Sequence, residues 1–484
     1  MPTKQNDKKR NVIYPLIALI VFLIFCLIPP FGAMTEFGMK VLGMFIAVIF
    51  VWATNTPTWV CVVMAFIMAA ISGLSFVDDI LLKGVLGNST LWICLSAFLM
   101  MYGLAKTNLV TYIAKKIMGM KFARKSPYAL MVVLLIATAV AAAVTQAMVA
   151  VLVLMLGMLK QVSADMKLEK YNMWTVMTAI SIAIVLCISG LGVPYCSGLV
   201  VILGLVSAYG AAVPTIMQCV AMTWIIVIAL IIILPLFTKF IIRPKIDKNA
   251  MENIDLTSSG LKFTKPMMYG VIVLVVTALI IVLPSFLPKT WALTTFLSQT
   301  GFVGAMFIGC ILLCFFKDDN GKPMFSFDSG MKEGFNWSVV WYMGVTYYIG
   351  GLMTGADVGF VATVSALLAP LRTVSPMVIA LIIFGIIVLL TNVLNNFVCV
   401  MIAAPLAVQL CSSDPVIMAM TVYILACGMM VAVALPSGSV AGVILHGDSD
   451  LIKPKQVIGW GYLLSVLVII VGDILFALLG RSIF

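Results

Sequence analysis

The side chains best suited to binding chemistry in this sequence are amides and hydroxyls that lie deep inside apolar runs. Three asparagines interrupt the apolar run 378–408, and a threonine and a glutamine interrupt an earlier one. These residues are Asn392, Asn395, Asn396, Thr145 and Gln146. Hydrocarbon offers such groups no hydrogen-bond partner, so they are costly unless they face protein, water or a ligand. We interpret the two segments as the tips of a substrate site at the middle of a membrane.

Glycine and proline interrupt two further apolar segments, 173–208 and 416–445, next to small hydroxyl residues. A broken helix exposes N–H groups at its N-terminal end, which attract anions, and carbonyls at its C-terminal end, which coordinate cations. The predicted substrate-binding residues are Thr145, Gln146, Asn395, Asn396, Ser197, Ser437 and Ser439. The predicted ion-binding residues are Gly192, Pro194, Asn392, Pro436 and Gly438.

Charge in these segments favours an anionic cargo. The two tips and the two interruptions contain no Asp, Glu, Lys or Arg. A cationic substrate would require a buried carboxylate, whereas an anion is held by amides, hydroxyls and helix ends. One acid, Asp473, lies within the last apolar segment. It is a candidate proton site, and the alternative is an ordinary solvated acid near the outer interface.

Composition places the chain among polytopic helical membrane proteins. Of its 484 residues, 63% are hydrophobic and 10% are charged, and no polar stretch is long enough to form a separate soluble domain. The net charge of +11 lies in short loops between apolar segments, so we attribute it to membrane topology and not to nucleic-acid binding. Cysteines within the apolar runs indicate packing, and we predict neither a metal site nor a cofactor.

The apolar run 127–159 is too long for one crossing and too short for two. Lys and Arg flank it on both sides, and cytoplasmic loops carry an excess of these residues. The run must therefore enter and leave on the same side, as a re-entrant hairpin. We interpret the run 376–410 in the same way.

Two re-entrant hairpins and about 11 transmembrane helices give a consistent topology. It leaves five of the 29 Lys and Arg residues outside and the N-terminus in the cytoplasm, with the C-terminus outside. The predicted parts are a cytoplasmic tail (1–11), a first membrane half (12–238), a cytoplasmic linker (239–266) and a second membrane half (267–484). We expect a multi-pass protein of the plasma or inner membrane.

The two halves resemble each other weakly. Segment 91–109 parallels 339–358, and segment 189–202 parallels 434–444. In the predicted topology the helix 91–105 runs inward and the helix 338–355 runs outward. The chain therefore has the inverted repeat that is typical of secondary transporters.

The order of helix, re-entrant tip and broken helix, used twice, resembles the divalent anion–sodium symporter family of the ion transporter superfamily, over about residues 80–475. The resemblance implies transport of a dicarboxylate, citrate or sulfate, usually with sodium, by a homodimer with an elevator motion. The chain resembles a divergent member of this family. The family has Ser-Asn-Thr at both tips, and here residues 144–146 are Val-Thr-Gln and residues 395–397 are Asn-Asn-Phe, so that only Asn396 matches. The family's Thr-Pro-Pro-Asn stretch is also absent from both breaks, where residues 197–200 are Ser-Gly-Leu-Val and residues 439–442 are Ser-Val-Ala-Gly.

These observations predict a secondary active transporter for a small anionic solute, with Na⁺ or H⁺ as candidate coupling ions. The alternatives are a proton-coupled or exchange-type carrier of the same fold and, from another class, a membrane-embedded enzyme. An enzyme would need a nucleophile–base pair or a metal cluster at membrane depth, and the sequence has one histidine. We predict that the chain is not an enzyme, and that Cys196, next to the first break, reacts with water-soluble thiol reagents.

Overall fold

The computed structural model describes residues 12–484 apart from short interruptions. Outside the described part are 1–11, 55–57, 88, 108, 208, 248–250, 252–262, 286, 289, 318–320, 322, 335–340, 342–343, 346–347, 350, 354, 356, 368, 394–395, 436–437 and 449. The predicted tail 1–11, part of the predicted linker and three predicted site residues fall there. Those three residues are Asn395, Pro436 and Ser437.

Apart from one isolated bridge between Lys317 and Pro323, the regular elements of the described residues are all helical, which confirms the predicted all-α class. The helices of the first half are α2 (Tyr14–Leu27), α3 (Glu36–Ala53), α4 (Thr58–Ser72), α5 (Ser89–Ala105), α6 (Leu109–Met118), α7 (Pro127–Thr145), α8 (Met148–Asp165), α9 (Met173–Ser189), α10 (Ser197–Ser207) and α11 (Ile216–Phe237). Those of the second half are α12 (Lys265–Val282), α13 (Ala292–Phe315), α14 (Phe327–Ser329), α16 (Phe360–Leu367), α17 (Pro376–Leu390), α18 (Asn396–Cys411), α19 (Pro415–Met429), α20 (Val440–Gly447) and α21 (Pro454–Ile483).

Six helical stretches of the described chain are long and apolar enough to cross a membrane, and they comprise α7, α8, α11 with its extension to Ile242, α12, α13 and α21. Shorter apolar helices accompany them, including α9, α17 and α19. The lengths fit a hydrocarbon core about 30 Å thick. The chain is thus a multi-pass helical membrane protein, while the number of crossings stays a prediction.

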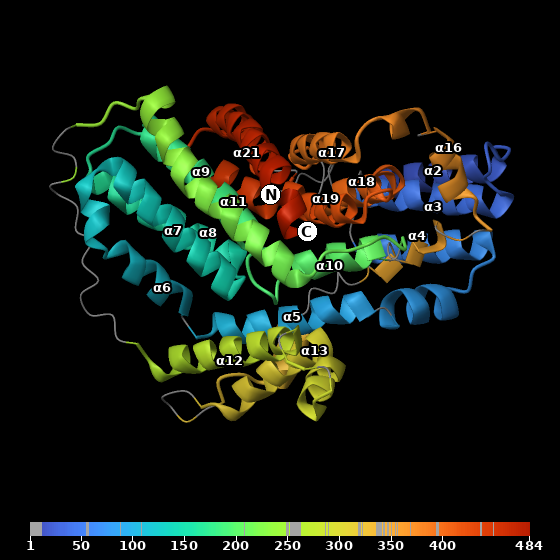
Figure 1. Ribbon diagram of the computed structural model, residues 1–484, viewed down its shortest axis with the longest axis horizontal. Coiled ribbons are helices and arrows are strands. Elements are labelled where there is room, and N and C mark those ends of the chain that lie inside the picture. The colour runs from blue at the N-terminus through green and yellow to red at the C-terminus, as the bar shows by residue number, and fades with distance from the viewer. Residues whose placement is uncertain are drawn as a thin grey trace.

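The apolar run 127–159 forms two helices, α7 and α8, that are joined by a turn. α7 ends at Thr145, and Gln146 adopts the left-handed conformation with φ of 54°. A left-handed residue stops an α-helix because it turns the next N–H away from the helix axis. α8 then begins at Met148, and both helices pack against α9 (Figure 1).

The apolar run 376–410 is divided in the same way. α17 ends at Leu390 and α18 begins at Asn396, so the polar residues of the run occupy the connection between them. Both helices pack against α19. That either helix pair re-enters a membrane from one side stays a prediction.

An interrupted helix follows each helix pair, and a long helix follows the interruption. The first interruption separates α9 from α10, and α11 comes next. The second separates α19 from α20, and α21 comes next. We call α7–α10 the first unit and α17–α20 the second unit. The same succession of elements therefore occurs once in each half.

The two units interlock through the short helices that follow the interruptions. α10 of the first unit packs against α18 and α19 of the second. α20 of the second unit packs against α8 and α9 of the first. Each unit thus packs one short helix against the other unit, and the two interruptions lie between the units.

Ion pairs place the ends of the two helix pairs that lie away from their connecting turns at opposite ends of α21. Near the end of α8, Lys160 contacts Asp448 at 2.7 Å, shortly before α21 begins. Directly after α18, Asp414 contacts Arg481 at 2.7 Å, in the last turn of α21. A helix of 30 residues is about 45 Å long. The two helix pairs therefore point toward each other from opposite ends of the fold, as an inverted repeat requires.

Loops that were predicted to be cytoplasmic meet at the end of the fold marked by Lys160. Lys170 contacts Asp450 at 3.4 Å, and the Asn172 side chain donates to the Lys245 carbonyl at 2.9 Å. The loops 160–172, 239–247 and 446–457 thus share one side. Their orientation in the cell stays a prediction.

Candidate functional site

The tip of the first helix pair is bonded to the first interruption. The Gln146 side-chain Nε2 donates to the Gly190 carbonyl at 2.7 Å and lies 3.1 Å from the Ala143 carbonyl. Across the same contact, the Tyr195 hydroxyl donates to the Val144 carbonyl at 2.9 Å. These bonds satisfy carbonyls at the end of α7 and at the interruption, where the helices end and leave carbonyls without helical partners.

Thr145 is buried at this tip and bonded to its own helix. Its hydroxyl donates to the Ala141 carbonyl at 2.6 Å and lies 3.4 Å from the Ala147 N–H, which donates to it. Only 4% of the residue is exposed. The structure therefore places Thr145 inside the first unit.

Asn392 makes the corresponding connection in the second unit. Its Nδ2 donates to the Val388 and Val431 carbonyls at 2.7 and 3.0 Å. Its Oδ1 accepts from the N–H groups of Val433 and Ala434 at 2.9 and 2.7 Å. These four bonds use both N–H groups and both lone pairs of the amide. Asn392 is fully buried and holds the second interruption to the tip of its own unit.

Two glycines allow the backbone of each interruption to approach a tip. A Cβ on Gly190 would lie 1.9 Å from Met148 Cε, and a Cβ on Gly438 would lie 2.4 Å from the Thr391 carbonyl oxygen. Both distances are far inside van der Waals contact. Gly438, a predicted ion-binding residue, therefore serves the close packing of backbone on backbone.

The two other predicted ion-binding residues in the first interruption lie in its turn. The Gly192 carbonyl accepts from Trp224 Nε1 of α11 at 2.9 Å. Pro194 is half-buried within the turn that precedes α10. The backbone of Ser197 begins α10, and its side chain lies outside the described part.

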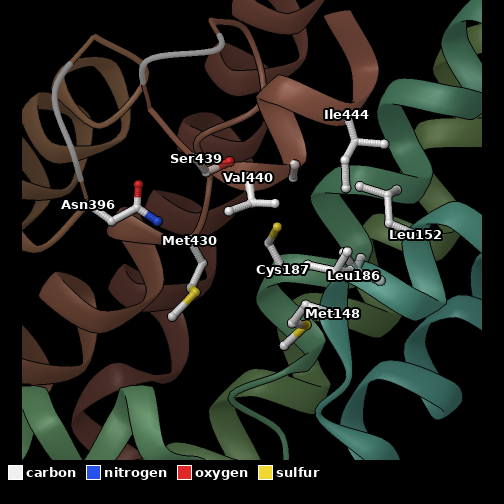
Figure 2. A pocket seen from close by; sticks show the side chains of 11 residues that line it. Met148, Leu152, Leu186, Cys187, Asn396, Met430, Ser439, Val440 and Ile444 are labelled. Atoms are coloured by element: carbon white, nitrogen blue, oxygen red, sulfur yellow. The ribbon is translucent and has the colours of Figure 1, made fainter. Parts of the chain in front are cut away.

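A cavity of about 160 Å³ lies between the two units, and Figure 2 shows it from close by. The first unit lines it with Met148, Val149, Leu152, Leu186 and Cys187. The second unit lines it with Asn396, Met430, Ser439, Val440, Ala441 and Ile444. Of the predicted substrate-binding residues in the described chain, Asn396 and Ser439 line this cavity. Thr145 and Gln146 are not among its lining residues.

The amide of Asn396 extends toward the cavity, as Figure 2 shows. Its Oδ1 accepts from the Thr391 hydroxyl at 2.9 Å, and that hydroxyl also lies 3.1 Å from the Met429 carbonyl. The bond orients the amide so that its nitrogen faces the cavity. Asn396 thus offers N–H donors to a ligand.

Ser439 lines the cavity as the N-cap of α20. Its hydroxyl accepts from the Gly442 N–H at 3.2 Å and donates to the Ala432 carbonyl. At the other end of the same helix, His446 Nε2 lies 2.9 Å from the Ala434 carbonyl. Side chains of α20 therefore hold the second interruption in place.

Three helices begin at the cavity. Its lining includes the first residues of α8, α18 and α20, namely Met148, Asn396 and Val440. The first N–H groups of a helix have no partner within the helix, and the helix dipole places positive charge there. In this arrangement three such ends converge on one cavity, which favours an anion.

Most lining residues were missed because nothing in the sequence separates them from ordinary core. Leu152 and Ile444 lie one helical turn beyond the first lining residues of α8 and α20, and Leu186 lies in the last turn of α9. Their helical spacing from the tips was the one signal that would have pointed to them. Cys196, which was predicted to react with thiol reagents, is 3% exposed in this structure, whereas Cys187 lines the cavity. The reactivity of Cys196 stays a prediction.

Asp473 lies apart from the cavity, in the C-terminal half of α21. The residue is half-buried, and its Oδ1 is buried with no hydrogen-bond partner among the described residues. The described chain also holds no cluster of three or more His, Cys, Asp or Glu that would bind a metal. Asp473 is therefore an isolated acid within an apolar helix.

Comparison with known proteins shows the fold. No family model matches the chain, and no curated protein sequence matches it. The chain is similar to the crystal structure of the YdaH transporter of Alcanivorax borkumensis, whose topology is described as unusual. The two share 12% sequence identity with a TM-score of 0.56, and the match covers 84% of this chain and 88% of the other. The chain is a multi-pass membrane protein with the fold of a transporter.

Proposed function

We propose that the chain is a secondary active transporter that carries a small anionic solute by alternating access. The observation that carries this proposal is the cavity of about 160 Å³ between the two units. It is lined from both repeats, which is where secondary transporters built from inverted repeats bind their cargo. Its position between units that each contain a helix pair and an interrupted helix supports transport over a structural role.

An anion suits the chemistry of the cavity. The described lining residues include no Asp or Glu, so a cation would lack a charge partner among them. The Asn396 amide and the beginnings of α8, α18 and α20 supply N–H groups instead. An anion would therefore exchange its hydration for fixed donors and helix dipoles.

The moving part in this proposal is the pair of interlocked units. Gln146 joins tip to interruption in the first unit, and Asn392 does so in the second. Because α10 packs against the second unit and α20 packs against the first, the two units would move together as one rigid body. The remaining helices, such as α2–α4 and α12–α13, would form the scaffold of an elevator (Figure 1). The homodimer and the plasma or inner membrane location belong to the same proposal.

For the coupling ion, the second candidate is a proton-coupled or exchange-type carrier. Sodium coupling would use free carbonyls at the interruptions. Side chains already occupy several of them, and these carbonyls are those of Gly190, Gly192, Val431, Ala432 and Ala434. This occupation favours protons or exchange over sodium. Asp473, with a buried oxygen that lacks a described partner, is the residue we propose as the proton site.

An enzyme is the weaker hypothesis for this cavity. Cys187 and Ser439 are the nucleophiles among its described lining residues, and no His, Asp, Glu or Lys accompanies them there. A catalytic thiol requires a base or a nearby cation to form the thiolate. The lining therefore suits binding better than covalent chemistry.

Purified full-length protein tests the proposal by thermal unfolding in the presence of organic acids, inorganic anions and organic cations, with sodium and with potassium. A ligand that binds the folded state raises the unfolding midpoint. Hits are then tested for uptake into liposomes under imposed sodium, proton or counter-substrate gradients. We expect at least one anion to stabilise the protein and to be accumulated. Stabilisation by organic cations alone would overturn the proposal.

A further inference from the structure

The cavity is chemically one-sided, and this asymmetry deepens the proposed function. The first unit contributes Met148, Val149, Leu152, Leu186 and Cys187, whose side chains carry no oxygen or nitrogen. Among the described lining residues, the two side chains with an oxygen or nitrogen, those of Asn396 and Ser439, come from the second unit. In Figure 2 these two residues lie on one side of the cavity and Leu152 and Leu186 lie on the other.

We infer that the substrate has a single carboxylate on a compact apolar body, with the carboxylate at Asn396 and the body against Leu152, Leu186 and Ile444. This inference rests on the proposed function, since it assumes that the cavity holds the transported anion. It departs from the dicarboxylate that the family resemblance implies. The structure supports the departure because the amide-bearing tip of the first unit is turned away from the cavity.

The contacts of Gln146 show that its amide faces away from the cavity. Its Nε2 donates to the Gly190 carbonyl at 2.7 Å, within the first unit. Asn396 instead faces the cavity, because the Thr391 hydroxyl bonds its Oδ1. A site with matching side-chain donors for two carboxylates would have one such donor from each unit. Here the described lining has such donors on one side.

A second carboxylate would therefore lie beside Leu152, Leu186 and Ile444. Those side chains offer no hydrogen bond, and an ionised group in apolar surroundings loses its hydration without replacement. An alkyl chain in the same place buries apolar surface, which is favourable. The lining thus selects against a charge at the far end of the substrate.

Size sets the length of the apolar body. An apolar cavity of about 150 Å³ in another protein holds benzene, which has about six heavy atoms. The cavity here is of similar volume, about 160 Å³, and it is partly open, so it accommodates a body of at least this size. We therefore expect unbranched or lightly branched acids of about four to six carbon atoms to fit.

The test compares three ligands of equal chain length on the full-length protein in nanodiscs, by isothermal titration calorimetry. Pentanoate has one carboxylate, glutarate has two, and 1-pentanol has none. We expect pentanoate to bind at least tenfold more tightly than either of the others. The ratio of these affinities is measured on the wild-type protein, so it does not depend on whether a variant folds.

The outcomes separate the two proposals. Glutarate binding as tightly as pentanoate would overturn the single-carboxylate inference and leave the anion carrier standing, with the start of α8 as a second anion site. Equal binding of 1-pentanol and pentanoate would overturn both. If no acid of this length binds while an inorganic anion does, the inference fails and the carrier again stands.

A variant checks that the first unit provides the apolar side. Leu152→Gln places an amide among the lining residues of α8, so glutarate should gain at least fivefold relative to pentanoate. The matched control is Val153→Gln, because Val153 is the next residue of α8, is 55% exposed and does not line the cavity. The control should keep the wild-type preference. An unchanged ratio in both variants would overturn the placement of the apolar body at Leu152.

Discussion

The Gln146 side chain donates a hydrogen bond of 2.7 Å to the carbonyl oxygen of Gly190, 44 residues later in the chain. The bond joins the turn between α7 and α8 to the point where α9 ends. It satisfies a carbonyl that would otherwise lie unpaired in an apolar interior. A polar residue that looked like a ligand thus stabilises the first unit.

Replacement of Gln146 by Met tests this role. The change keeps the length of the side chain and removes its donors, so we expect a lower free energy of unfolding by about 1–3 kcal/mol. The thermal unfolding midpoint of the purified protein measures the loss. Gln161→Met, on the exposed surface of α8, is the control and should leave the midpoint unchanged. A Gln146→Met protein as stable as the control would show that the bond contributes nothing.

Asn392 and Asn396 lie four residues apart, yet we expect different effects from their replacement. Loss of Asn392 should lower stability, and loss of Asn396 should weaken anion binding. Asn392→Ala leaves two N–H groups and two carbonyls of the second unit without partners, and each buried unpaired group costs about 1–3 kcal/mol. We expect a protein that unfolds at a markedly lower temperature or is not recovered from the membrane. Normal stability of Asn392→Ala would contradict the four-bond arrangement.

Asn396→Ala should leave the fold intact and weaken anion binding. The residue is half-buried and has one described hydrogen bond, which its Oδ1 accepts from the Thr391 hydroxyl. Loss of a hydrogen bond to a charged ligand costs about 1.5–3 kcal/mol, which corresponds to a loss of affinity of about tenfold or more. Titration calorimetry measures the affinity, and the unfolding midpoint serves as the control. Unchanged affinity would remove Asn396 from the site.

The positions of the turns at the two tips could be predicted from sequence, whereas the directions of their side chains could not. Polar residues in long apolar runs are expensive, so the turns after Thr145 and Leu390 lie within the predicted runs 127–159 and 376–410. Whether Gln146 faces a cavity or a carbonyl depends on its left-handed backbone, which the sequence does not reveal. The amphipathic signal that marks a helix face is also absent where every face is apolar.

Most of the cavity lining was invisible for a related reason. Leu152, Leu186 and Ile444 have the composition of ordinary packing residues. Only the three-dimensional arrangement of α8, α9 and α20 places them at the wall of the cavity. The predicted all-α class needed no such information, because composition alone excludes other folds in a membrane.

Cysteine labelling distinguishes a residue of the cavity from one that is buried. Cys187 lines the cavity, and Cys196 is 3% exposed. We expect a small methanethiosulfonate reagent to modify Cys187 faster than Cys196, and a bound anion to slow the reaction at Cys187 alone. Intact-mass and peptide mass spectrometry of single-cysteine proteins measure both rates. Faster reaction at Cys196 would contradict the placement of the cavity.

The ion pair of Lys160 with Asp448 ties α8 to the end of α20, two helices that line the cavity. The atoms are 2.7 Å apart, but the Lys160 side chain is 42% exposed, so we expect a contribution of only about 0–1 kcal/mol. A double-mutant cycle with Lys160→Met and Asp448→Asn measures the coupling through the unfolding midpoint. The coupling should decrease as salt is raised, because exposed charges are screened. A coupling that is independent of salt would show that the two side chains do not interact as an ion pair.

Asp473 provides the test of how transport is driven. Its carboxylate lies in α21, away from the cavity, and one of its oxygens is buried with no partner among the described residues. If the acid takes up and releases a proton during transport, Asp473→Asn removes proton coupling but not substrate binding. We expect the variant to bind the anion with wild-type affinity and to exchange it across liposome membranes, while a proton gradient no longer drives its accumulation. Asp328→Asn, an exposed acid after α13, is the control and should keep gradient-driven uptake. Accumulation by Asp473→Asn at the wild-type level would exclude Asp473 as the coupling site, and accumulation that follows sodium instead would favour coupling at the backbone of the interruptions.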